Sequence, residues 1–150
     1  MLDYSLLEQG LKQSFETEGY IVSDIKQQGD EFRLLVRQTT DKGSTGVELY
    51  VLKNMEQLFY TAQIMLKKHL ERFKSFTSNE QDEFRDQLKS LLNDSKIDEF
   101  DFNEEEGNFG IVIRNILALP YESPSELAPP FDNINETGNA ILVFIKKKFE

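Results

Sequence analysis

The chain has 150 residues, of which 39% are hydrophobic and 29% charged, and it contains no cysteine. The 27 acidic side chains outnumber the 17 basic ones, and the net charge of −10 disfavours nucleic acid and anionic membranes as partners. Without cysteine there is no disulfide, thiolate zinc site or cysteine nucleophile. A chain of this length is expected to form one domain, residues 1–150.

Two stretches bear on where the protein resides. The first ten residues, MLDYSLLEQG, lack the basic region and long apolar run of a secretion signal. The apolar run at 140–145 is far shorter than the roughly 20 residues that a membrane span needs. We therefore expect a cytoplasmic protein that does not insert into a membrane.

An amphipathic helix is predicted for residues 3–18. Ser5 and Glu8 fit a capping box, and Gly19 suits the left-handed position that ends a helix. Three apolar residues recur at four-residue spacing and form one stripe: Leu7, Leu11 and Phe15.

Three β-like runs follow, at residues 20–27, 31–38 and 46–53. Their connectors are rich in turn-forming residues, which predicts an antiparallel meander. Alternation in the second and third runs predicts a core set: Phe32, Leu34, Val47, Leu49 and Val51.

The residues that alternate with this core set point to the other face of the sheet. Leu35, Tyr50 and Leu52 lie on it, and we expect them to form a partner-binding surface that exposes Tyr50. An antiparallel sheet covered on one side leaves a face or an edge on which a peptide can dock. The alternative is that helices cover both faces.

Two segments fit either a strand or a helix. Residues 57–66 are expected to form a fourth strand because Phe59 and Tyr60 favour strands, although helical spacing also fits. A helix near Lys67 would follow. Residues 139–147 are expected to belong to a terminal helix that starts near 131, with a closing strand as the alternative.

Between these segments the pattern is clearer. Residues 78–93 predict a helix that Thr77 and Glu80 cap. The runs 96–102 and 107–117 predict a hairpin. Four prolines between 120 and 130 predict a surface loop, because proline interrupts both strand ladders and helix interiors.

No motif carries recognisable chemistry. The single histidine, His69, has no companion ligand or nucleophile nearby in the sequence and is interpreted as a solvated helix residue. The glycine-containing stretch 41–46 lacks the pattern of a phosphate-binding loop and is interpreted as a hairpin turn. We therefore predict neither an enzyme nor a cofactor.

The acidic run 98–106 is the one alternative with chemical content. Counted from Asp101, Gly107 falls at position seven and Val112 at position twelve, so the EF-hand spacing is not met. A charged hairpin that keeps a sheet edge apart from other chains is preferred. The alternative is a metal-assisted hydrolase or cation-binding protein, whose ligands would be four acids: Asp98, Asp101, Glu104 and Glu106.

The order of predicted elements describes an α+β two-layer sandwich, an antiparallel sheet with packed helices. It resembles the type III secretion chaperone-like fold. The segments TSNEQDEFRDQLKSLL (77–92), IRNILALPYE (113–122) and FDNINETGNAILVFI (131–145) resemble an uncharacterised prokaryotic family with this fold. The resemblance implies a small intracellular homodimer that binds another polypeptide, with no implied biological role.

The leading hypothesis is therefore a homodimeric protein-interaction or chaperone-like module. Besides the cation-dependent alternative, a structural subunit of a larger assembly remains open, because the absence of a catalytic motif is equally compatible with it.

Overall fold

The computed structural model describes residues 2–38 and 46–150. The elements of these residues, in chain order, are α1 (Tyr4–Thr17), β1 (Tyr20–Asp24), β2 (Asp30–Gln38), β3 (Val47–Leu52), β4 (Gln57–Met65), α2 (Leu70–Lys74), α3 (Ser78–Asn93), β5 (Glu99–Asn103), η1 (Glu105–Gly107), β6 (Gly110–Ala118), η2 (Pro124–Glu126) and α4 (Ala128–Phe149). The predicted turn at 41–46 lies almost entirely outside the described residues.

The strands form one sheet in the order β1-β2-β3-β4-β6-β5, and every neighbouring pair is antiparallel. The meander from β1 to β4 and the β5–β6 hairpin are therefore confirmed. Strand β6 pairs with β4 over the full length of both, which leaves β1 and β5 at the two edges. The α+β architecture expected from the sequence is present.

Helix α1 ends as predicted but begins differently. Asp3, in extended conformation, accepts hydrogen bonds from Ser5 N at 3.0 Å and Leu6 N at 3.2 Å. The prediction that Ser5 and Glu8 form the cap is therefore wrong, because Asp3 reaches the free N–H groups of the first turn. Gly19 has φ +93°, the left-handed conformation expected after the helix.

Both ambiguous segments are settled by their neighbours. Residues Gln57–Met65 form a strand, as preferred, because β3 and β6 pair with its two sides. The terminal segment forms α4, so the strand alternative for 139–147 is wrong. Although α4 has 22 residues, none of the helices in the described parts of the chain is long and apolar enough to cross a membrane.

The proline-rich segment is only partly a loop. Pro124 opens the short helix η2, and Pro129 and Pro130 lie in the first turn of α4. The prediction that 120–130 is a loop throughout is wrong at its end. Proline is tolerated in the first turn of a helix because the N–H groups there have no partner inside the helix.

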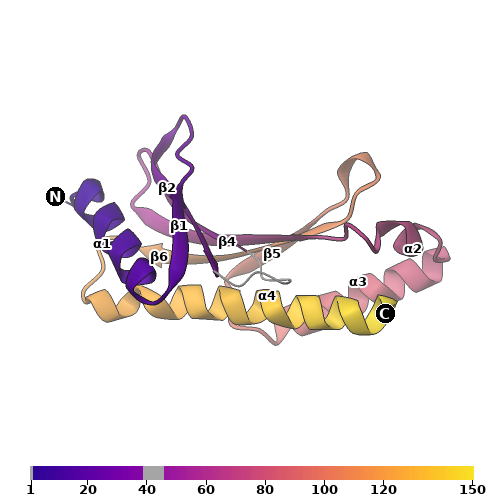
Figure 1. Cartoon of the computed structure of the whole chain (residues 1–150). Coiled ribbons are helices and arrows are strands. Elements are labelled where there is room, and N and C mark those ends of the chain that lie inside the picture. Colours follow the sequence, from indigo (N-terminus) through magenta and orange to yellow (C-terminus); the bar gives the residue numbers. More distant parts are fainter. Residues whose placement is uncertain (1, 39–45) are drawn as a thin grey trace.

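Helices α1, α3 and α4 lie on one side of the sheet (Figure 1). We call the covered side the inner face and the opposite side the outer face. Inner-face strand residues join buried helix residues such as Phe84, Ile134 and Ile141 in one apolar cluster. The predicted core residues all belong to this cluster and are at most 1% exposed: Phe32, Leu34, Val47, Leu49 and Val51.

Candidate functional site

The outer face is where strand parity places the side chains that the core does not use. The register aligns Arg33 with Tyr50, Tyr50 with Phe59, and Phe59 with Ile116 across four strands. In the described ranges, 2–38 and 46–150, no helix packs over this row (Figure 1). The outer face is therefore the surface on which a partner would meet the sheet directly.

Tyr50 does not have the exposure that its parity predicts. Its side chain is only 7% exposed, because its ring stacks on Phe59 with 5.2 Å between centroids and the Arg33 guanidinium lies 3.9 Å above it. Leu35 and Leu52 are half-buried. The prediction of an exposed Tyr50 is wrong, because neighbouring side chains on the outer face cover the ring; partner binding by the three residues stays a prediction.

A polar row continues from Tyr50 toward the β5 edge. The Tyr50 hydroxyl lies 3.0 Å from Thr61 Oγ1, and Arg114 Nε donates to the same oxygen at 3.2 Å. Arg114 Nη1 also donates to Glu99 Oε1 at 2.6 Å. These contacts connect β3, β4, β6 and β5, and they hold Arg114 over the sheet rather than free in solvent.

On the other side of Tyr50, Arg33 is held by two carboxylates. Its Nε donates to Asp30 Oδ2 at 2.9 Å, and its Nη1 donates to Glu48 Oε1 at 3.3 Å. The hydrogen bonds from Arg33 hold the pKa of Asp30 below its ordinary value, together with the Gln27 N–H and against the effect of burial. Arg33 is therefore positioned as a fixed cover for Tyr50.

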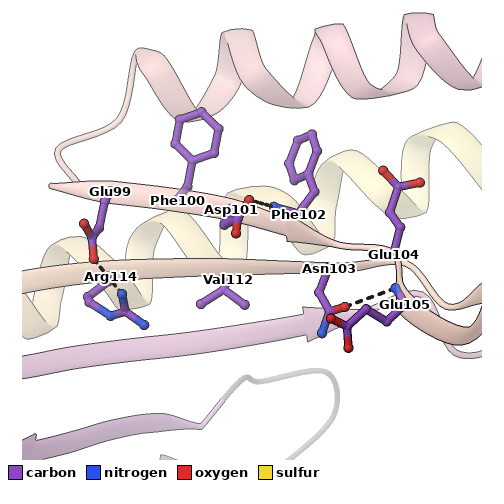
Figure 2. A pocket seen from close by; sticks show the side chains of 9 residues that line it. All are labelled: Glu99, Phe100, Asp101, Phe102, Asn103, Glu104, Glu105, Val112 and Arg114. Carbon is purple, nitrogen blue, oxygen red and sulfur yellow. Dashed lines mark hydrogen bonds and ion pairs between the residues drawn. The ribbon is translucent and has the colours of Figure 1, made fainter.

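The β5–β6 hairpin adds a hollow of about 560 Å³ to the edge of the sheet. Figure 2 shows Phe100 and Phe102 pointing toward α3, while Arg114 reaches Glu99. Strand β5 pairs only with β6, so its other edge has no strand partner among residues 2–38 and 46–150. Four acidic side chains line the hollow: Glu99, Asp101, Glu104 and Glu105.

The acids of this hairpin have separate partners. Glu104 pairs with Arg85 on α3 at 2.6 Å, and Asp98 accepts from Ile116 N at 2.7 Å. Asp101 accepts from Phe102 N at 2.9 Å. Within the part of the chain that the structure describes, no three histidine or acidic side chains are grouped as metal ligands. The geometry therefore supplies no shared ligand set for the cation-dependent alternative.

His69 is not the solvated side chain that the sequence indicates. It is 13% exposed and stacks on Phe149 with 5.3 Å between ring centroids, and its Nε2 lies 3.1 Å from Glu150 Oε2. The local sequence has no signal for this contact, because the partners are about eighty residues away along the chain.

Comparisons with known proteins give information on the fold but none on the function. No family model matches the chain, and no curated protein matches it. The structure is similar to the crystal structure of an uncharacterized protein from Methanothermobacter thermautotrophicus, with a TM-score of 0.81 and 13% sequence identity, over 95% of this chain and 99% of that chain. At this identity the similarity shows a shared fold and carries no function.

Proposed function

We propose that the chain is a protein-interaction or chaperone-like module that binds another polypeptide on the outer face of its sheet. The observation that carries the proposal is a sheet whose three long helices, α1, α3 and α4, all lie on one side. The opposite side presents half-buried apolar side chains: Leu35, Leu52, Val112 and Ile116. Apolar side chains that neighbouring residues only half cover are stabilised further when a partner removes them from water.

The edge of β5 that pairs with no described strand extends this surface. A free strand edge offers backbone N–H and C=O groups to an extended peptide, and the adjoining hollow has room for its side chains. Pairing of β5 with a second copy is disfavoured in two registers: an antiparallel pair centred on Phe100 sets Glu99 opposite Asp101, and one centred on Asp101 sets two Asp101 side chains opposite each other. A different polypeptide is therefore the better occupant of this edge.

The finer assignment to the type III secretion chaperone-like fold, and a homodimeric state, are parts of the same proposal. Support comes from the element order and from the sequence segments that resemble an uncharacterised family with this fold. A cytoplasmic location is also proposed, as expected from the lack of a secretion-signal pattern in residues 1–10.

The partner surface is tested by Leu35→Lys, which places a positive charge on the outer face. The new lysine lies opposite Glu48 on β3, and because the two charges are opposite the substitution should not disrupt the β2–β3 pair. The control is Val143→Lys, at a residue of α4 that is 51% exposed. Affinity purification from the native host, with quantitative mass spectrometry, should show a partner that the Leu35 variant loses and the Val143 variant keeps. Equal capture by both variants would remove the outer face from the proposal.

The oligomeric state is tested separately by size-exclusion chromatography with light scattering. A dimer at micromolar concentration is expected, and a strict monomer at high micromolar concentration would contradict it. A complex of fixed stoichiometry that persists through purification would instead identify the chain as a structural subunit of a larger assembly.

A further inference from the structure

A second hollow lies where the segment before α2 meets the last turns of α4. We call it the α2–α4 hollow; its volume is about 340 Å³, at the small end of the roughly 300–1,000 Å³ typical of small-ligand sites. Its floor is apolar and consists of Met65, Leu142 and Ile145. Ile145 is 4% exposed and belongs to the core cluster, so the floor is continuous with the interior of the protein.

The rim of the α2–α4 hollow is basic, although the whole chain carries a net charge of −10. Lys67, Lys68 and Lys146 line it, and all three are exposed. Lys68 pairs with Glu150 at 3.7 Å, whereas no acid within the described ranges pairs with Lys67 or Lys146. Positive charge is therefore concentrated at the opening of the α2–α4 hollow.

A carboxylate of the chain itself already contacts this basic rim. One carboxylate oxygen of Glu150 lies 3.1 Å from His69 Nε2 and 3.7 Å from Lys68 Nζ. The His69 ring is held by its stack on Phe149, with an interplanar angle of 13°. Arg72 Nη1 donates to the Phe149 carbonyl oxygen at 2.7 Å and fixes this end of α4. A carboxylate is thus already bound at the edge of the apolar floor.

We propose that the α2–α4 hollow binds a small amphipathic carboxylate, an unbranched monocarboxylic acid whose chain lies on the apolar floor. The ligand carboxylate would pair with Lys67 and Lys146, and the Glu150 carboxylate, which is held beside them by Lys68 and His69, would repel it. Charge complementarity and the apolar floor select this class over a cation or a neutral polar molecule. The site uses no residue of the outer face, so the proposal is independent of the proposed function.

The test is titration of the full chain with decanoate below its micelle concentration. Binding is monitored by the NMR signals of the methyl groups of Met65, Leu142 and Ile145. Saturable shifts of these signals are expected. Octanoate should bind more weakly by about fourfold for each methylene that leaves the floor. Decyltrimethylammonium, with the same chain and the opposite charge, should not saturate the site; equal binding of this cation would overturn the assignment of a carboxylate.

Two variants separate a ligand site from a merely structural cluster, because they should change affinity in opposite directions. Lys146→Gln should weaken decanoate binding by up to about fivefold, and Glu150→Gln should strengthen it by up to about fivefold because the repelling carboxylate is gone and Lys68 is released. Lys147→Gln is the matched control, since Lys147 is exposed but does not line the hollow. Melting temperatures establish that the variants are folded.

Three further results would overturn the assignment of a small-carboxylate site to the α2–α4 hollow. Unchanged affinity in both the Lys146 and the Glu150 variants would overturn the proposal. A peptide that ends in apolar residues followed by glutamate, if it binds more tightly than decanoate, would overturn the small-molecule assignment and give the hollow to a polypeptide. Absence of saturable shifts with every probe would show that the hollow binds no carboxylate of this kind.

Discussion

The two faces of the sheet bury aromatic and aliphatic side chains in different ways. On the inner face, Phe32 and Tyr60 join a continuous apolar cluster that the helices close. On the outer face, Tyr50 and Phe59 are almost as buried, at 7% and 8% exposure, yet Arg33 and neighbouring strand residues supply the cover. The comparison teaches that an alternating strand pattern defines two faces but not how each face is shielded from water.

The largest effect should come from removing part of the inner-face cover. A chain that ends at Asn139 lacks three buried α4 residues: Ile141, Ile145 and Phe149. Each stabilises the folded state by about 1.5–3 kcal/mol, and a whole domain is stable by only about 5–15 kcal/mol. Cooperative melting, followed by circular dichroism, should therefore be lost. A truncated chain that melts sharply at an unchanged temperature would contradict this account of the inner face.

The same substitution on each face sharpens the comparison. Phe32→Ala should destabilise the protein by about 3–5 kcal/mol, because a closed cavity adds to the lost burial. Phe59→Ala should cost less, about 1.5–3 kcal/mol, because the space opens toward the outer surface and only the burial term is lost. Urea unfolding measures both values; equal losses would show that the outer face is as closed as the inner one.

The ion pair over Tyr50 makes the outer face sensitive to acid. The pKa of Asp30 is lowered in the folded protein, so its contribution to stability is present above the ordinary carboxyl pKa and is lost as pH falls below about 4. Asp30→Asn should cost about 1–3 kcal/mol at neutral pH and reduce this acid dependence. Asp86→Asn, at an exposed position of α3, is the control. Urea midpoints between pH 3 and 7 measure the difference.

The smallest effect concerns the two tyrosine hydroxyls. Tyr60→Phe leaves the Leu127 carbonyl oxygen without its 2.8 Å donor and should cost about 0.5–1.5 kcal/mol. Tyr50→Phe should cost less, because Thr61 Oγ1 keeps its hydrogen bond from Arg114. Denaturant unfolding compares the two variants, and a larger loss for Tyr50 would contradict the order.

Tyr60 also predicts a dependence on alkaline pH. Burial raises the pKa of Tyr60, so the unfolded chain loses this proton first and stability falls as pH rises above about 10. The fall should be shallower in Tyr60→Phe, in urea unfolding measured from pH 8 to 11. An identical pH profile for the variant would assign the alkaline loss to other groups.

The elements with strong local signals were predictable. The capping box of Thr77 and Glu80 begins α3, and both hydrogen bonds of that box are present, Thr77 N to Glu80 at 2.9 Å and Glu80 N to Thr77 at 3.2 Å. The parity of Phe32 and Leu49 was likewise correct. These features depend on residues within one or two turns or on one strand, where spacing alone defines the geometry.

The candidate site was only partly predictable. Parity placed Tyr50 on the outer face, but the Arg33 guanidinium that covers it comes from another strand, and its position depends on register. The alternative interpretation of 98–106 required four acids to act together, whereas in the structure Glu104 pairs with Arg85 on α3. Such pairings depend on how distant segments pack, and the local spacing of residues contains no information about it.

The sequence by itself determined the helices and strands that have strong local signals, the inner sides of β2 and β3, and the absence of cysteine chemistry, because these follow from residue type and from the periods of helix and strand. Only the tertiary structure decided how Tyr50 is covered and that His69 meets Phe149 and Glu150. The physical reason is that side-chain burial and ion pairing arise between segments brought together by folding, so they depend on contacts that no single segment specifies.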